Sequence, residues 1–373
     1  MRMNFPQQIT FAFLLCFLSN PVIQAQYEFK TEKKIHCTSI KNQARTGTCW
    51  SFSTASFLES ELMRMGMEDI NLSEMFIVRN IYKDKAHNYI LRQGKANFSQ
   101  GSLAHDLIRI AEKDGLMTEE AYSGLLSGES RHDHGEMVNG LHGFLDGVRK
   151  SKVLSHKWRS AFDGILDSYI GNVPEQFEYE DQSYTATTFA EMTKLKTEDY
   201  ISITSFTHHP FYEQFILEIP DNYSNGSFYN VPLDELMSII DYALLAGYSI
   251  VWDGDVSEKG FSARNGMALL PVDPKREDLF TNPGPEINVT QENRQINFEN
   301  YSTTDDHLMH IVGIALDQDG TKYYLTKNSW GEISDYEGFL YMSEAFMKMK
   351  TVSIMIHKDG LPRNSSEKLF EME

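Results

Sequence analysis

Cysteine is scarce in this chain of 373 residues, which contains only Cys16, Cys37 and Cys49. Cys16 lies in an N-terminal segment that we expect to be removed, so two cysteines remain in the mature protein. Two cysteines cannot build the multiply bridged framework of a small secreted domain. They could pair with each other, but the surroundings of Cys49 favour a free thiol, and we interpret Cys37 as a small buried apolar side chain.

Basic residues are also few, because 34 lysines and arginines face 53 aspartates and glutamates, for a formal net charge of -19. Proteins that bind nucleic acid need lysine and arginine to displace counterions from phosphates, so no nucleic-acid partner is expected. The acidic residues are spread along the chain without a long block of one sign. We interpret them as a solubilising surface.

Long apolar segments are missing as well. The most apolar one, residues 9–18, follows the early charge of Arg2 and ends before a small-residue segment. This layout is typical of a secretory signal peptide over residues 1–25 and predicts export to the periplasm or the extracellular space. Spanning a bilayer takes about 20 apolar residues, so no stable membrane insertion is expected. Lipid attachment at Cys16 is the weaker alternative, because Leu15 is bulkier than the small residue expected there.

Repeats, low-complexity tracts and long linkers rich in proline or glycine are absent too, so residues 26–373 are predicted to form a single unit. Apolar residues at helical spacing predict a helix over 49–65, with Thr46 or Thr48 as its cap. Asn71 and Glu74 have the spacing of a capping box and predict the start of a second helix. The first part of the mature chain is therefore expected to be mainly helical.

The C-terminal half carries the signals of strands. Residues rich in β-branched and aromatic side chains predict strands near 200–204, 248–252, 307–315, 323–327 and 338–342. A helix over 232–245 should end at Gly247. The predicted fold is α+β, with a helical lobe over about 40–120, a large insertion over about 120–230 and a β lobe over about 231–360. The β lobe is expected to be an antiparallel sheet or barrel.

One segment around Cys49 has the chemistry of a nucleophile. A thiol reacts as the thiolate, and the N-terminus of a helix stabilises negative charge through its free amides and dipole. Gly47 lets a substrate approach the backbone, and the amide of Gln43, six residues before Cys49, could donate to the oxygen of a carbonyl under attack. Taken alone, however, a cysteine at a helix start is more often structural.

The ten residues Gln43–Phe52 resemble the active-site segment of papain-like cysteine peptidases, including the spacing from glutamine to cysteine and the Cys-Trp-Ser-Phe run. One departure is Thr46, which stands where papain and the cathepsins carry a disulfide-forming cysteine. The bleomycin hydrolase and aminopeptidase C branch of the family also lacks that cysteine. The resemblance implies a papain-like fold and peptide substrates, with no cofactor.

Two later motifs extend the resemblance. His307 precedes Gly313 by six residues, as in the histidine strand of the family, and Asn328 to Gly331 is similar to its Asn-Ser-Trp-Gly motif. The resemblance implies that His307 is the base, that Asn328 orients its ring and that Trp330 covers their hydrogen bond and borders the substrate. His310 lies an odd number of residues along the same strand, so its side chain should project from the opposite face.

The implied mechanism starts from an ion pair between the Cys49 thiolate and the His307 imidazolium. Cys49 attacks the peptide carbonyl, Gln43 and the Cys49 amide hold the oxyanion, and water activated by His307 releases the acyl group from the thioester. Gly101 is a candidate substrate-binding residue in the cleft, with an ordinary turn as the alternative.

The spacing favours the aminopeptidase C branch. His307 follows Cys49 by 258 residues, whereas ~130 to 150 residues separate them in papain-like enzymes. The short segment between the predicted cleavage site and Cys49 leaves no room for an inhibitory pro-region. The branch implies a homo-hexamer with inward-facing sites and a C-terminal arm that binds the substrate's amino group, although the tail Ser365–Glu373 is short.

Three alternatives remain beside an aminopeptidase. The first is an endopeptidase of the same fold, which would also cleave N-terminally blocked peptides. The second is an inactive peptide-binding homologue, which is disfavoured because all four proposed catalytic residues are present. The third is a metal site built from two pairs of histidines, His132 with His134 and His208 with His209. These pairs lack a ligand pattern of the zinc kind, so no metal is expected. We interpret them as surface histidines.

Overall fold

The computed structural model describes residues 27–68 and 70–370. The predicted signal peptide, residues 1–25, lies outside these ranges, so that prediction stays untested. Within the described ranges no helix combines the length and the apolar character needed to cross a membrane.

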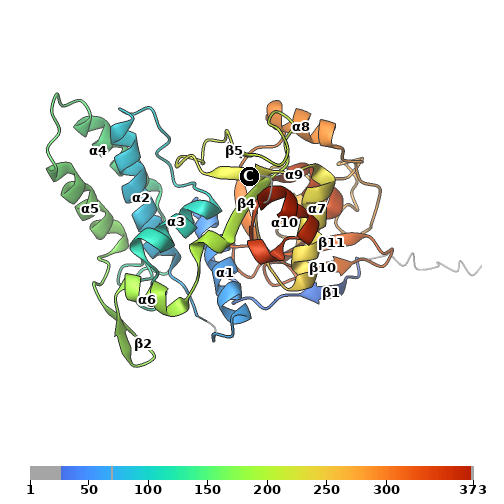
Figure 1. Ribbon diagram of the computed structural model, residues 1–373, viewed down its shortest axis with the longest axis horizontal. Coiled ribbons are helices and arrows are strands. Elements are labelled where there is room, and N and C mark those ends of the chain that lie inside the picture. Colours follow the sequence, from blue (N-terminus) through green and yellow to red (C-terminus); the bar gives the residue numbers. More distant parts are fainter. Residues whose placement is uncertain (1–26, 69, 371–373) are drawn as a thin grey trace, which may run out of the picture.

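The helical lobe lies on one side of the molecule (Figure 1). A small hairpin, β2 (Phe177–Tyr179) and β3 (Gln182–Tyr184), extends from it. Residues 120–195, whose structure the sequence left open, contribute half of the lobe's helices. The helices are α1 (Cys49–Arg64), α2 (Glu74–Leu91), α3 (Ala104–Asp114), α4 (Gly135–Val148), α5 (Lys157–Ile170) and α6 (Ala186–Thr193).

The other lobe is built on one large sheet. Its order is β5-β6-β4-β13-β7-β10-β11-β12-β9-β8, with β1 also paired to β10. Most neighbours are antiparallel, as predicted, but β4 with β6 and β9 with β12 are parallel pairs. The strands are β1 (Lys30–Lys34), β4 (Tyr200–Thr204), β5 (Gln214–Ile216), β6 (Ser227–Asn230), β7 (Ile250–Gly254), β8 (Phe261–Ser262), β9 (Met267–Ala268), β10 (His307–Leu316), β11 (Lys322–Lys327), β12 (Phe339–Ser343) and β13 (Thr351–His357).

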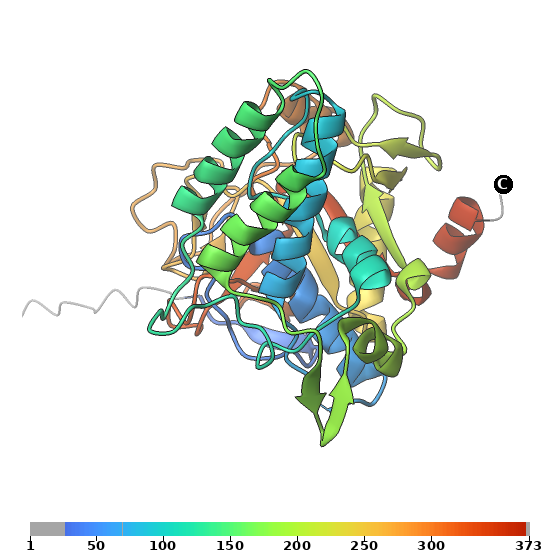
Figure 2. The ribbon, with the colours of Figure 1, turned by 90° about the vertical axis from the view of Figure 1, so that its left-hand side faces the viewer.

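Four helices accompany the sheet. They are α7 (Leu233–Ala246), α8 (Gln291–Glu299), α9 (Glu344–Lys350) and α10 (Arg363–Phe370). As predicted, α7 ends at Gly247, whose φ of +95° suits glycine. Figure 2 shows α10 at the edge of the molecule.

The centre of the sheet is buried on both faces, which explains why its strands are almost continuously apolar. Along β10, Leu308 belongs to the core of the helical lobe, whereas Met309 and Ile311 belong to the core under α7. Neighbouring side chains of a strand point to opposite faces, so β10 joins the two cores. The site residues of β10 are thereby held between the lobes.

The predicted elements are confirmed at the helix of Cys49 and at the strands of His307 and of residues 323–327. The predicted boundary near residue 231 falls inside the sheet, because β4, β5 and β6 lie in the range assigned to the insertion and join the sheet through the pairing of β4 with β13. The N-terminal segment also joins the sheet through β1. These pairings connect residues far apart in the chain, which local sequence patterns do not reveal.

Candidate active site

Cys49 is the first residue of α1, as predicted, and its side chain is buried. The predicted threonine cap is wrong: Thr48 makes no side-chain cap bond, and its hydroxyl pairs with the hydroxyl of Thr46 at 2.6 Å. The first helical bond from Ser51 goes to the Thr48 carbonyl at 2.9 Å. An uncapped first turn leaves amide groups available to stabilise an anion at this helix end.

The loop before α1 is held by Gln100, a contact that the sequence did not reveal. Its side-chain oxygen accepts from the Gly47 amide at 2.8 Å, and its carbonyl accepts from the Trp50 indole at 2.9 Å. A Cβ on Gly47 would lie 3.1 Å from the Cβ of Gln100. A side chain at position 47 would therefore press on the residue that braces Cys49 from both sides.

His307 opens β10 and is held by two residues from the segment after β11. Its Nε2 lies 2.8 Å from Asn328 Oδ1, and the Trp330 ring stacks on the imidazole with centroids 4.6 Å apart. Asn328 Oδ1 also accepts from the Ser329 amide at 2.8 Å, which identifies this atom as the oxygen. Nε2 therefore carries the proton, and Nδ1 keeps a lone pair with which to act as a base.

The thiol of Cys49 lies beside the start of β10. The backbone amide of Leu308, the residue after His307, is close enough to this thiol to favour its thiolate form, although burial raises the pKa of Cys49 overall. The fold thus brings Cys49, His307, Asn328 and Trp330 together from segments that lie more than 250 residues apart in the chain.

Gln43 lies at the same place but has partners of its own. Its Nε2 donates to the Thr46 carbonyl at 2.7 Å, and its Oε1 accepts from the Ser329 hydroxyl at 2.6 Å. Its backbone amide donates to the Ser329 carbonyl at 2.9 Å, and the Gly331 amide donates to the Lys41 carbonyl at 3.0 Å. This pairing joins the segment before Cys49 to the one that carries Asn328, and one amide hydrogen of Gln43 stays available.

Burial dominates the electrostatics of the site. It raises the pKa of Cys49 to about 12, against the lowering by the Leu308 amide. Burial likewise lowers the pKa of His307 to about 4, against the raising by Asn328. Desolvation therefore favours the uncharged thiol and imidazole and opposes the predicted resting ion pair. The helix terminus and the Leu308 amide are the features that favour the thiolate.

Cys37 and Cys49 are both free thiols, but Cys37 is only partly buried, so its interpretation as a buried apolar side chain is wrong. His310 faces α1: its Nδ1 lies 2.9 Å from the hydroxyl of Ser56 and its side chain is fully buried. It belongs to the packing under α1.

The histidine pairs differ from each other. His132 and His134 are buried, so their interpretation as surface residues is wrong; the Tyr82 hydroxyl lies 3.0 Å from His134 Nδ1, and burial lowers the pKa of His134 to about 4. Within the described ranges, His208, His209 and Glu218 are close enough to share an ion. Both histidines already contact the carboxylate of Glu218, at 3.2 and 2.8 Å.

The predicted C-terminal arm has no counterpart in the described residues. In α10, Lys368 donates to Glu235 of α7 at 2.9 Å, and Phe370 packs edge-on to Tyr229. Residues 371–373, where such an arm would end, lie outside the described residues.

Behind the proposed nucleophile, α1 and α2 bury a cluster of charges around Lys41. Its ammonium donates to Glu59 at 3.3 Å and to Glu74 at 2.5 Å. Glu119 lies beside them, with one buried carboxylate oxygen that has no partner in the described structure. Burial and the charge of Glu74 raise the pKa of Glu119 to about 8, although Lys41 lowers it.

This shift predicts a pH-dependent stability. The folded pKa of Glu119 lies above its ordinary value of 4.5. The stability gained from the protonated carboxyl group is therefore lost as the pH rises from about 4.5 through 8. We expect Glu119→Gln to unfold at a higher urea concentration than the parent at pH 8.5, with little difference at pH 5. Glu120→Gln, an exposed neighbour, is the control; equal midpoints for parent and Glu119→Gln at both pH values would refute the prediction.

The two lobes, the cysteine at a helix N-terminus and the histidine held by an asparagine define the class of papain-like cysteine peptidases. Comparison with known proteins agrees: the model of the Peptidase C1-like family matches residues 165–373, and that of the papain family cysteine protease matches residues 23–157. The first match covers more than half of the chain. The protein therefore belongs to the Peptidase C1-like family and is a cysteine peptidase.

Similar proteins carry aminopeptidase names. Aminopeptidase G of Lactobacillus delbrueckii subsp. lactis is 23% identical, over 91% of this chain and 85% of its own length. Aminopeptidase C of Streptococcus thermophilus is 21% identical, over 86% and 81% respectively. The crystal structure of PepW from Lactobacillus rhamnosis HN001 superposes with a TM-score of 0.73 at 19% identity, covering 92% of this chain and 85% of that one. This likeness confirms the predicted papain-like fold.

Proposed function

We propose that this cysteine peptidase is an aminopeptidase in which Cys49 is the nucleophile and His307 the general base. The observation that carries the assignment is the bond between His307 Nε2 and Asn328 Oδ1, because it leaves Nδ1 to take the thiol proton. The names of the similar aminopeptidases C and G support removal of residues from the N-terminus.

The proposed reaction proceeds in two stages. The thiol proton passes to His307 Nδ1 as sulfur attacks the carbonyl carbon, and the imidazolium then returns it to the leaving amine. Water, deprotonated by His307, hydrolyses the thioester and restores the thiol. The Cys49 amide and the remaining amide hydrogen of Gln43 are proposed to donate to the oxyanion, and Trp330 keeps water from the His307–Asn328 bond.

The test compares leucyl-aminomethylcoumarin with its N-acetylated form. We expect the parent to hydrolyse the free substrate at least about 100-fold faster by kcat/KM, because a site built for a charged amine rejects an analogue without it. Equal cleavage of the acetylated and the free substrate would favour the endopeptidase and contradict the aminopeptidase. A folded protein that binds these substrates without cleaving either would be the inactive homologue.

Two further proposals come from the sequence. The first is that the protein is exported and that residues 1–25 are removed. Protein recovered outside the cytoplasm should then begin at Gln26, which N-terminal sequencing would test. The homo-hexamer implied by the family predicts a sedimenting species of six chains, and a monomer at micromolar concentration would contradict it.

A further inference from the structure

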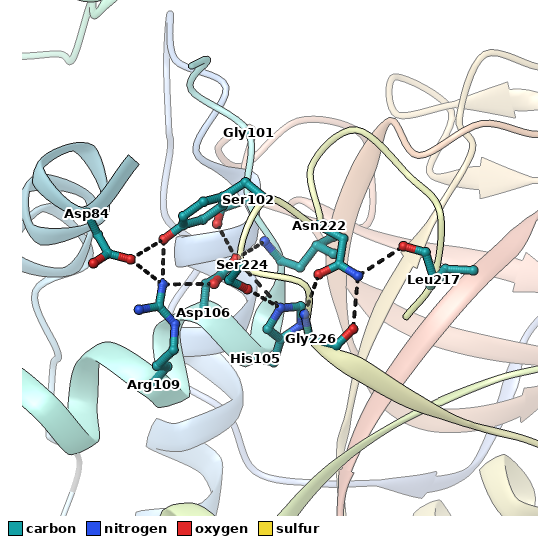
Figure 3. Close-up of polar contacts among 12 residues, drawn as sticks. Asp84, Gly101, Ser102, His105, Asp106, Arg109, Leu217, Asn222, Ser224 and Gly226 are labelled. Atoms are coloured by element: carbon teal, nitrogen blue, oxygen red, sulfur yellow. Dashed lines mark hydrogen bonds and ion pairs between the residues drawn. The ribbon is translucent and has the colours of Figure 1, made fainter. Parts of the chain in front are cut away.

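A loop over residues 217–226, between β5 and β6, reaches from the sheet to the helical lobe (Figure 3). Asn222 holds its shape: Nδ2 donates to the carbonyls of Leu217 at 3.0 Å and Gly226 at 2.9 Å, and Oδ1 accepts from the Gly226 amide at 2.8 Å. These three bonds close the loop on itself, so its residues have a defined position before any substrate binds.

The 217–226 loop is also fixed to α2 and α3. The Tyr223 hydroxyl donates to Asp84 at 3.0 Å and accepts from Arg109 at 2.5 Å. The Ser224 hydroxyl lies 3.0 Å from His105 Nε2. Both residues are labelled in Figure 3. Contacts to two helices of the opposite lobe make the loop a rigid bridge between the lobes.

The bridge places Asp221 against Gly101. Asn97 donates to Asp221 Oδ1 at 3.0 Å and to the Pro220 carbonyl at 3.1 Å. A Cβ on Gly101 would lie 1.8 Å from Asp221 Oδ2, so a side chain at position 101 would displace the Asp221 carboxyl group. Asp221 Oδ2 accepts no hydrogen bond from the described residues. Gly101 follows Gln100, which braces Cys49, so this oxygen lies at the edge of the proposed active site.

A second carboxyl group comes from the segment before β10. Asp305 precedes His307 by two residues, and behind it lies Asp253 of β7, which is 2% exposed. Asp253 Oδ1 and Asp305 Oδ2 are both buried and accept no hydrogen bond from another residue of the described structure, and the two carboxyl groups lie within hydrogen-bonding reach of each other. Two carboxyl groups that face each other repel when both are ionised, so the pair is stable only with a shared proton or a bound cation.

Carboxyl groups therefore outnumber cationic groups beside the thiol. The carboxyl groups of Asp305, Asp221 and Asp253 all act on Cys49 electrostatically. The nearby cation is Lys85, whose ammonium is buried and donates to the carbonyls of Ser99 and Gly101. One ammonium faces three carboxyl groups whose pKa values are raised by burial, and a further cation bound here would favour their ionised forms.

A cavity of about 460 Å³ adjoins this cluster. Asp305 lines it together with Ile219 and Pro220 of the loop and with Phe298 and Tyr301. A largely apolar cavity with a carboxyl group on its wall suits a ligand that combines an apolar group with a positive charge.

We propose that Asp221 and Asp305 bind the α-ammonium group of the substrate's N-terminal residue, and that the 217–226 loop closes the cleft beyond it. This inference rests on the aminopeptidase function proposed above and assigns its selectivity to side chains within the fold. An acetylated N-terminus brings no charge and would leave the carboxylates buried without a partner, which explains rejection of blocked peptides.

The test measures kcat/KM for leucyl-aminomethylcoumarin and its N-acetylated form with Asp221→Asn and Asp305→Asn. We expect each variant to lose roughly 10- to 100-fold on the free substrate, because a hydrogen bond to a charged group is removed. Activity on the acetylated substrate should stay unchanged or rise. The ratio of the two values should therefore fall by at least about tenfold, mainly through KM for the free substrate.

Asp181→Asn is the matched control, because it removes the same charge from an exposed turn. The ratio does not depend on the fraction of folded enzyme, and alkylation of Cys49 counted by mass spectrometry measures that fraction separately. If the parent prefers the free substrate and both variants keep the same ratio of kcat/KM values, this inference is overturned and the aminopeptidase proposal stands. A parent that cleaves both substrates equally would instead overturn the aminopeptidase proposal itself.

Discussion

Cys49→Ala is expected to lower kcat for amino-acyl substrates by about 10⁴-fold or more, to a rate near the limit of detection. The variant lacks the atom that forms the thioester, and His307, whose Nε2 is held by Asn328, would have no thiol to deprotonate. Initial-rate assays with leucyl-aminomethylcoumarin measure the loss. KM is expected to change little, because the bound substrate contacts the remainder of the cleft.

Cys37→Ala is the control for this prediction, because Cys37 is the other free thiol of the described chain and contacts none of the proposed catalytic residues in the hydrogen-bond network. It should keep the parental rate, and alkylation by iodoacetamide should still inactivate it. Urea unfolding of Cys49→Ala checks that its fold persists. Hydrolysis by Cys49→Ala at the parental rate would contradict the proposed nucleophile.

Lys41→Met is expected to destabilise the protein by about 3–5 kcal/mol. Burial alone would lower the pKa of the Lys41 ammonium, but Glu74 and Glu59 outweigh it and hold that pKa above its ordinary value. Methionine would leave both carboxyl groups buried without their cation. The free energy of unfolding in urea at pH 7 measures the loss, which is large against a typical total of about 5–15 kcal/mol.

Lys30→Met is the control, because Lys30 forms an ion pair with Glu32 at the surface, where its side chain is 80% exposed. Exposed pairs contribute little to stability, so this variant should unfold with the parent. Equal unfolding free energies for Lys41→Met and the parent would show that the buried cluster is stable without its cation.

Motifs of neighbouring residues located the main elements of the site. Cys49 at a helix start, His307 on a strand and Asn328 after the next strand were all predicted, because each depends on residues close in the chain. The threonine cap failed because Thr46 and Thr48 bond to each other, a competition between side chains that the cap pattern does not include.

Contacts between distant segments could not be predicted in the same way. Gln100 braces Gly47 and Trp50 across about 50 residues, and Asp221 meets Gly101 across 120. His132 was interpreted as a surface histidine because its pair lacks a ligand pattern of the zinc kind, yet the fold buries it. Residue type indicates exposure only on average, and contacts with distant segments, such as that of His132 with Phe52 of α1, decide it for each side chain.

The sequence by itself determined the class of chemistry, since the order and spacing of the motifs around Cys49, His307 and Asn328 are properties of the chain. Only the tertiary structure decided what surrounds them: the desolvation of the thiol and imidazole, and the bridge that sets Asp221 beside Gly101. The physical reason is that helix and strand signals act over a few residues, whereas burial and charge environment come from every segment that packs against a site.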